Sequence, residues 1–546
     1  MTVAEDRLTS RTGLSAEASR EVPANRRDAT TVALVAVTVT ALVLRYVLAF
    51  RSGVFAANDL DGAAYFGAAV QLVHGSIPYK DFAFVQPPAV LLIVSPIAAL
   101  SRLIGTGAAF DIIRLLMPGV GTACVYLAAR RVRHRGPVAV LVTGGIFAGY
   151  LPSIFASRTL YLEPWMDLAC LAGITLAFDA EGNLATVRRM GLAGVCFGVA
   201  VSVKLWALAP LAVLVVVTCL HKPCKELLQR LGGGAAVGLF AVALPFVVAS
   251  PGGFFHDVII SQLDRFGGRV PLSLRMDEIL GVAAVGTPRS LSYAVIFVAV
   301  SACVALLVAA ARAVQAKGRR PSPLAVYSVI CLAVAFDVLL IPGEFTYHYA
   351  DFLAPFAAVS FGLAAAALAR RFATTPNMAR LAAMGTAVVL GAYLVHDVPR
   401  LRAQLPAVSA TAVDKVIPQG ACVVTDYPAV TIAADRFVAE AVDCPEIVDA
   451  FGFDLTLDDG KTPEVSNRPT AALAAAWQDA FRKAGWIVLS PSARSRIPLT
   501  MRLRRYLERN FRLVDRQDPQ IWERYATGST ALVSTAKHDA LAVSRR

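Results

Sequence analysis

The residues with the greatest chemical potential lie in a short polar stretch after the first apolar segment. Residues 58–65 read NDLDGAAY, which places two carboxylates, Asp59 and Asp61, beside a glycine and a tyrosine. Loop acids are commonly solvated charges, but such acids usually stand among residues of mixed charge. Asp61 and Tyr65 are four residues apart and would share one face of a short helix. A carboxylate held in this way can act as a general base on a hydroxyl group.

Four further ionisable side chains stand at the ends of apolar segments, namely Arg45, Glu163, Lys204 and His348. Each has a structural alternative, either snorkelling to the membrane surface or an ion pair such as Glu163 with Lys204. Lys204 is the hardest to explain in this way, because no polar loop separates its flanking apolar runs. Ionisable residues within membrane segments are functional candidates. Cations at this face, Lys80 included, would suit a phosphate.

The elements that must position these residues are membrane-spanning helices. The chain has 546 residues, 56% hydrophobic and 17% charged, whereas soluble domains carry roughly a quarter charged residues. We predict an all-α polytopic membrane protein with about eleven transmembrane helices of roughly 20 residues. The predicted spans are 31–50, 109–130, 137–157, 165–179, 189–203, 205–220, 231–249, 290–312, 323–341, 349–369 and 380–397.

The basic loops give these spans an orientation. Clusters such as those at 130–135, 222–230 and 317–320 would all be cytoplasmic if the N-terminus is cytoplasmic and there are eleven crossings. A twelfth span at 87–103 would break this agreement, so we expect a juxtamembrane helix there, at the outer interface. All the candidate side chains then lie on one membrane face, which indicates a single cavity for an anionic substrate.

This orientation divides the chain into three regions. We expect a disordered cytoplasmic tail at 1–29, a transmembrane catalytic region at 30–398 with a first outer loop at 51–108, and an extracytoplasmic soluble domain at 399–546. We further expect a multi-pass protein of the plasma membrane. The Ala-, Val- and Arg-rich composition suggests a GC-rich bacterial genome, with an actinobacterium as the expected source.

The C-terminal region has the pattern of a small α/β domain. Apolar residues typical of strands occur at 421–426 and 486–490, with helical patterns between them. Its only cysteines are Cys422 and Cys444. A lone pair in an outward-facing domain favours a disulfide, with two reduced buried thiols as the alternative.

Other classes of function find little support in the sequence. The formal net charge of +13 is explained by basic loops between apolar runs, so nucleic-acid binding is not expected. The chain has no zinc-type Cys/His spacing and no Walker-type or dinucleotide glycine motif. No cofactor is predicted with certainty. The two neighbouring carboxylates, Asp59 and Asp61, leave the binding of a divalent cation as an open alternative.

The order of the motifs resembles that of the GT-C superfamily of polyprenyl-phosphate-sugar-dependent glycosyltransferases. Within this superfamily the chain most resembles the protein O-mannosyltransferase and aminoarabinose transferase branch. The matching motifs are Asp61 with Tyr65, Gln86-Pro87-Pro88, Glu163-Pro164, Lys204 with Pro210, and His348-Tyr349 with Pro355. The family usually has Glu directly after the catalytic Asp, where this chain has Gly62, and this departure keeps Asp59 as an alternative base.

The resemblance implies a sugar donor linked to polyprenyl phosphate and a glycan, lipid or protein acceptor at the outer face. Asp61 would take the proton of the acceptor hydroxyl, with inversion at the anomeric carbon. Lys204, with Lys80 or Arg45, would stabilise the leaving phosphate. The remaining substrate-binding residues would be Glu163, His348, Tyr349 and Tyr65. Rival interpretations are a lipid or glycan transporter or flippase, and a non-catalytic membrane scaffold.

Overall fold

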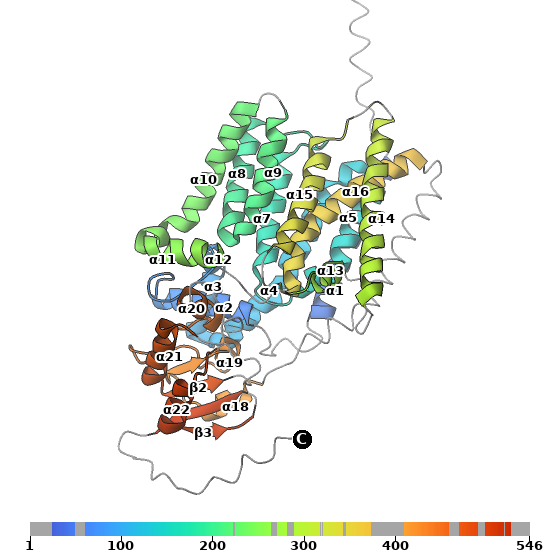
Figure 1. Ribbon diagram of the computed structural model, residues 1–546. Helices are drawn as coiled ribbons and strands as arrows, with labels where there is room; N and C mark the ends of the chain where they lie inside the picture. The colour runs from blue at the N-terminus through green and yellow to red at the C-terminus, as the bar shows by residue number, and fades with distance from the viewer. Residues whose placement is uncertain are drawn as a thin grey trace, which may run out of the picture.

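A long helical bundle and a smaller mixed domain make up the described chain (Figure 1). The computed structural model describes residues 24–49, 60–221, 224–263, 270–280, 289–316, 318, 320–341, 345–372, 409–457, 469–489, 497–517 and 519–525. The predicted span at 380–397, most of the predicted tail at 1–29 and Asp59 lie outside these residues.

Long helices form the bundle, and ten of the eleven predicted spans coincide with helices in the described residues. They are α1 (Ala24–Ala49), α4 (Thr106–Arg131), α5 (Pro137–Gly149), α7 (Leu162–Ala177), α8 (Val187–Val203), α9 (Leu208–Cys219), α10 (Cys224–Ala249), α14 (Arg289–Gln315), α15 (Pro323–Leu340) and α16 (Ala354–Phe372). Short elements complete it: α2 (Asp61–His74), α3 (Ala89–Ile104), η1 (Arg133–Arg135), α6 (Leu151–Ala156), η2 (Leu205–Ala207), α11 (Pro251–Phe255), η3 (His256–Ile260), α12 (Ser261–Leu263), α13 (Leu272–Leu280) and η4 (Tyr347–Leu353).

The chain is an all-α membrane protein in this region. Among the described residues, five helical stretches are long and apolar enough to cross a bilayer: Asp28–Leu48, Thr106–Arg131, Cys224–Ala249, Pro323–Leu340 and Tyr347–Phe372. Large apolar side chains on these helices face outward, as Val47, Phe240 and Val248 do. An exposed apolar surface of this kind is stable in lipid and costly in water.

One predicted span is interrupted near the site, and a second break falls where two predicted spans meet, at Lys204. The span at 137–157 breaks at Tyr150, whose extended backbone separates α5 from α6. The span at 205–220 begins with the 3₁₀ turn η2, because Lys204 is also extended and ends α8. Breaks of this kind leave backbone and side-chain polar groups inside the helical bundle, where they can line a site.

One end of the bundle gathers the short elements. Helices α2, α3, α11, α12 and α13 lie at the lower end with the C-terminal domain, whereas the α9–α10 and α14–α15 connections lie at the upper end (Figure 1). The segment 87–103, predicted as a juxtamembrane helix, forms α3, which packs on α2 and α4. This arrangement places the first polar loop, the interrupted helices and the C-terminal domain at one end.

The C-terminal domain is a small α/β domain with a four-stranded sheet. The strand order is β1-β2-β4-β3, with β1 parallel to β2 and the other pairs antiparallel. The strands are β1 (Val423–Thr425), β2 (Trp486–Leu489), β3 (Phe511–Asp515) and β4 (Gln520–Arg524). The helices are α18 (Thr411–Val416), α19 (Pro428–Ala433), α20 (Ala450–Leu457), α21 (Ala471–Lys483) and α22 (Met501–Asn510). The predicted strands correspond to β1 and β2.

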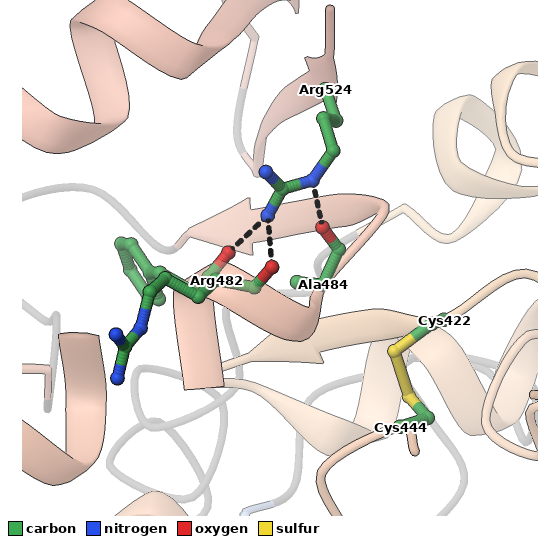
Figure 2. Close-up of a disulfide and its surroundings, with 6 residues drawn as sticks. Cys422, Cys444, Arg482, Ala484 and Arg524 are labelled. Atoms are coloured by element: carbon green, nitrogen blue, oxygen red, sulfur yellow. Dashed lines mark hydrogen bonds between the residues drawn. A yellow bond between two sulfur atoms is a disulfide. The ribbon is translucent and has the colours of Figure 1, made fainter. Parts of the chain in front are cut away.

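One disulfide and the hydrogen bonds of one arginine hold this domain together (Figure 2). Cys422 and Cys444 are joined by a disulfide with a Cα–Cα distance of 5.5 Å. Arg524 donates from Nε to the Ala484 carbonyl at 2.7 Å and from Nη2 to the Arg482 carbonyl at 2.8 Å. Carbonyls at the C-terminal end of a helix lack partners within the helix. The guanidinium therefore ties the end of α21 to β4.

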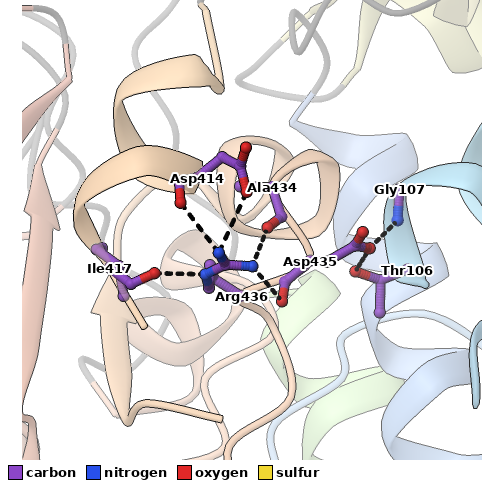
Figure 3. Close-up of polar contacts among 7 residues, drawn as sticks. All are labelled: Thr106, Gly107, Asp414, Ile417, Ala434, Asp435 and Arg436. Atoms are coloured by element: carbon purple, nitrogen blue, oxygen red, sulfur yellow. Dashed lines mark hydrogen bonds and ion pairs between the residues drawn. The ribbon is translucent and has the colours of Figure 1, made fainter. Parts of the chain in front are cut away.

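A third group of contacts docks the domain on the bundle (Figure 3). Asp435 Oδ1 accepts hydrogen bonds from Thr106 Oγ1 at 3.1 Å and from the backbone N–H of Gly107 at 2.8 Å. These groups begin α4, so a carboxylate of the C-terminal domain caps the positive end of a bundle helix. The adjacent Arg436 donates to the carbonyls of Ile417, Ala434 and Asp414.

Candidate functional site

The centre of the candidate site is a buried ion pair. Lys204 Nζ lies 2.5 Å from Glu163 Oε1, and these side chains are 8% and 1% exposed. Glu163 stands in the first turn of α7 and Lys204 directly follows α8, so each charge opposes the partial charge of its own helix end. The Lys204 ammonium also lies over the rings of Trp206, at 3.8 Å, and Tyr349, at 4.1 Å.

His348 connects this ion pair to the first polar loop. Its Nε2 lies 3.5 Å from Asp61 Oδ2 and 4.0 Å from Glu163 Oε1. The imidazole stacks on Tyr161, with ring centroids 3.9 Å apart. Four side chains from α2, α7, the end of α8 and η4 therefore meet at one place, although long stretches of sequence separate them.

Asp61 is the accessible member of this group. Its side chain is 32% exposed, whereas that of His348 is 5% exposed. Asp61 begins α2, where a carboxylate is favoured by the helix dipole. An exposed carboxylate whose one oxygen is near a histidine can receive a proton from a group that enters from outside.

Tyr65 follows Asp61 by one helical turn and borders the same site. Burial raises the pKa of Tyr65 well above its usual value, and the nearby charge of Asp61 raises it further. The phenol therefore stays protonated at neutral pH and can donate a hydrogen bond. Its ring meets Phe84 edge to face at 6.3 Å, which connects α2 to the segment that follows it.

The remaining predicted residues lie elsewhere. Arg45 is fully buried and donates to Ser157 at 3.2 Å and to Ser153 at 2.8 Å, an arrangement that ties α1 to α6. Lys80 is exposed and lines a different cavity of about 430 Å³, between the turn at 79–83 and the C-terminal domain. Neither has a direct contact with Asp61, Glu163 or His348 among the interactions of the described residues.

The sequence analysis missed two buried acids beside the site. Asp167 and Asp351 are 1% and 2% exposed. Asp167 lies one turn after Glu163 on α7, and Asp351 lies three residues after His348 in the 3₁₀ helix, so each follows a predicted residue on the same face. That periodicity was a usable signal, since both acids stand inside apolar runs.

The sequence left a divalent cation near Asp59 and Asp61 as an open alternative. No group of three or more His, Cys, Asp or Glu residues in the described residues has an arrangement that could hold a metal ion. Asp59, one of the two carboxylates of that candidate cation site, is outside the described residues. The arrangement as described offers acid–base chemistry and hydrogen bonding.

Comparison with known proteins identifies the fold. No family model and no curated protein sequence matches this chain. Among solved structures, ArnT from Cupriavidus metallidurans bound to undecaprenyl phosphate has a TM-score of 0.57 at 17% identity, covering 90% of this chain and 98% of ArnT. The arabinofuranosyltransferase AftD from mycobacteria has a TM-score of 0.51 at 14% identity, covering 91% of this chain and 40% of AftD.

A third similar structure is the oligosaccharyltransferase of Archaeoglobus fulgidus with a tethered acceptor peptide. Its TM-score is 0.50 at 12% identity, and the match covers 91% of this chain and 74% of that one. These three proteins are GT-C glycosyltransferases. The chain therefore has the GT-C fold of membrane glycosyltransferases, which confirms the fold class expected from the sequence.

Proposed function

We propose that this protein is a membrane glycosyltransferase that moves a sugar from a polyprenyl-phosphate-linked donor to a hydroxyl group of a glycan, lipid or protein. The observation that carries the proposal is the meeting of Asp61, Glu163, Lys204 and His348 at one end of a GT-C fold. A scaffold would not require this convergence. A transporter would be expected to place its polar groups near the bilayer midplane.

In this proposal Asp61 is the general base. As the acceptor oxygen bonds to the anomeric carbon, its proton passes to the Asp61 carboxylate, and the bond from the anomeric carbon to the phosphate oxygen breaks. The bonding electrons leave with the polyprenyl phosphate. A single displacement inverts the anomeric centre. His348, 3.5 Å from Asp61 Oδ2, holds the base in place.

Glu163 and Lys204 would act by holding other groups of the site in place. Their ion pair joins the start of α7 to the end of α8, and the Lys204 ammonium fixes the rings of Trp206 and Tyr349. Fixed polar groups around a reacting centre stabilise developing charge without reorganisation. We infer that this unit orients the donor sugar and the rings beside it. The site would work at the outer face of the plasma membrane, with the C-terminal domain extracytoplasmic.

Removal of the base tests the proposal. Purified protein would be assayed with a panel of polyprenyl-phosphate sugars, and transfer to acceptor would be measured for the wild type, Asp61→Asn and Asp59→Asn. Because a general base contributes about 10²–10⁴-fold, Asp61→Asn should lose at least ~100-fold of the rate with normal membrane insertion. Loss in Asp59→Asn alone would move the base to Asp59. Full activity in both variants would contradict the mechanism.

A further inference from the structure

A buried arginine beside the candidate site has no assigned role. Arg158 lies between α6 and α7, five residues before Glu163, and is 6% exposed. Its guanidinium carbon lies 3.9 Å from the ring centroid of Phe155. Stacking on an aromatic ring satisfies the face of a guanidinium, but its N–H groups point outward in the plane and still need acceptors.

Those acceptors are missing among the described residues. Arg158 Nε and Nη1 are both buried without a hydrogen-bond partner, and so is the hydroxyl of the adjacent Thr159, which is 1% exposed. Leaving a buried donor unsatisfied costs about 1–3 kcal/mol, and more for a charged group. Two neighbouring unsatisfied donors at one helix junction would be stabilised by an anionic acceptor that hydrogen-bonds both of them.

The other cations near the site are already engaged. Lys204 is paired with Glu163 at 2.5 Å. Arg45 donates to two serine hydroxyls and the Phe147 carbonyl, and of its nitrogens only Nη1 is without a partner among the described residues. A phosphate leaving group needs positive charge with free donors. Arg158, with two unsatisfied nitrogens, meets that requirement better than Lys204 and Arg45, two of the three cations for which the sequence predicted this role.

A stack of rings connects Arg158 to the proposed base. The Phe155 ring stacks on Tyr161 at 5.9 Å, and Tyr161 stacks on His348 at 3.9 Å. His348 in turn contacts Asp61. This stack connects the Arg158 guanidinium, ring by ring, to the side chains of the candidate site.

The surroundings of Arg158 suit an anion that carries a hydrocarbon chain. Leu44 and Leu48 of α1 pack with Phe155, Tyr161 and Tyr347 in an apolar cluster separate from the main core. On the other face of the same helix end, Val43 and Val47 are 52% and 59% exposed. A lipid chain lying on α1 could therefore place its headgroup near the junction of α6 and α7.

We propose that Arg158, with Thr159, binds the phosphate of the polyprenyl-phosphate-linked donor. This inference rests on the proposed function and names a residue that the sequence analysis did not single out. Arg158 would neutralise the phosphate as the bond to the sugar breaks, and Thr159 would donate its hydroxyl to the same group.

Direct binding to the full-length protein in lipid nanodiscs would test this inference. The probes would be a short-chain polyprenyl phosphate, the matching neutral polyprenol, inorganic phosphate and phosphatidylglycerol. Arg158→Gln should weaken binding of the polyprenyl phosphate at least ~10-fold, equivalent to about 1.4 kcal/mol, and leave polyprenol binding unchanged. The control Arg275→Gln removes another buried arginine, which donates to the carbonyls of Leu339 and Leu340, and should leave the affinity unchanged.

Thermal stability separates a binding role from a structural one. Because the orphan charge is costly without its ligand, ligand-free Arg158→Met should melt at or above the wild-type temperature while losing phosphate affinity. A lower melting temperature together with unchanged affinity would overturn the proposal. Thr159→Val should weaken binding less than Arg158→Gln does.

The outcomes also separate this inference from the proposed function. Wild-type protein that binds no polyprenyl phosphate would contradict both. Tight binding that is equal in wild type and Arg158→Gln would overturn the inference alone. Tighter binding of inorganic phosphate or phosphatidylglycerol than of polyprenyl phosphate would overturn the assignment of the donor as the ligand.

Discussion

Two buried arginines in this molecule have opposite surroundings. Arg436, at the docking contact of the C-terminal domain, is 8% exposed and donates from all three of its nitrogens to carbonyls and to Asp414 (Figure 3). Arg158, at the junction of α6 and α7, is 6% exposed and leaves Nε and Nη1 without partners among the described residues. Complete satisfaction is typical of a structural contact, whereas unsatisfied buried donors indicate a place for a ligand.

The same contrast extends to the acids. Asp435 uses its carboxylate to cap α4. Beside the candidate site, Glu163 Oε2, Asp351 Oδ1 and both carboxylate oxygens of Asp167 are buried without partners among the described residues. The docking contact is thus closed as it stands. The bundle site keeps polar capacity that its own side chains do not use, which is what a binding site requires.

The largest loss of stability and activity is expected from breaking the ion pair of the bundle site, Glu163 with Lys204. Glu163→Gln would leave the Lys204 ammonium buried beside two rings without its counter-charge, and breaking such a pair typically costs about 3–5 kcal/mol. We expect a large fall in melting temperature and loss of transfer. The double variant Glu163→Gln/Lys204→Met should recover much of the stability and none of the activity. Equal melting temperatures for the single and double variants would contradict this account of the pair.

The next effect tests the contacts that Arg436 makes within the C-terminal domain, beside the docking residue Asp435. Arg436→Met would remove every donor that satisfies the carbonyls of Ile417 and Ala434, at a cost of about 2–3 kcal/mol. We expect the C-terminal domain to melt earlier and to become sensitive to protease. The comparison becomes sharper when Arg158→Met is measured in parallel, since that variant should not lose stability. If both variants lost stability equally, the distinction between the two arginines would be wrong.

The smallest effect concerns Asp257 in η3, which contacts the segment after α2 through the backbone N–H of Phe84. Burial raises the pKa of Asp257 above its usual value, although hydrogen bonds from His256 and the Phe84 N–H oppose the shift. A carboxyl with a raised folded-state pKa favours the folded state most at pH below its unfolded pKa, about 3.9. This contribution is lost as the pH rises through the folded pKa.

Asp257→Asn removes that titration and keeps an oxygen for the Phe84 N–H. Unfolding free energies measured between pH 4 and 7 should decline less steeply with rising pH in this variant than in the wild type. A matched decline in both proteins would assign the pH dependence to other groups. The variant should also retain wild-type transfer, because Asp257 lines the cavity at 79–83 and has no contact with Asp61 among the described residues.

Sequence patterns predicted the bundle well because hydrophobic runs of span length have few alternative structures in a membrane. They predicted Glu163, Lys204 and His348 because ionisable residues are rare there. They placed Lys80 with these residues, whereas the structure sets it toward the C-terminal domain. The membrane face on which a span ends can be predicted from the charges of the loops. The direction of a side chain within a loop depends on tertiary packing and cannot be predicted in this way.

The role proposed for Arg158 could not be predicted from the sequence, for a related reason. The tract from Pro152 to Tyr161 looks like the end of one apolar span, and an arginine at a span end is normally explained by snorkelling. In the structure a break at Tyr150 makes α6 a separate short helix, and Arg158, just after it, is buried with Nε and Nη1 lacking partners among the described residues. In the C-terminal domain, β3 and β4 were missed because their residues are mixed in polarity, with exposed and charged positions such as Arg512.

The cap that Asp435 makes on α4 has a consequence for protein engineering. Gly105 and Gly107 leave no room for a side chain there, since a Cβ on Gly105 would lie 2.6 Å from the Asp435 carboxylate and one on Gly107 would lie 2.9 Å from the Ala433 carbonyl. Asp435 itself adopts a left-handed backbone, with φ of 54°. A chimaera that exchanges C-terminal domains between enzymes of this fold would therefore have to transfer Gly105, Gly107 and Asp435 as one inseparable unit.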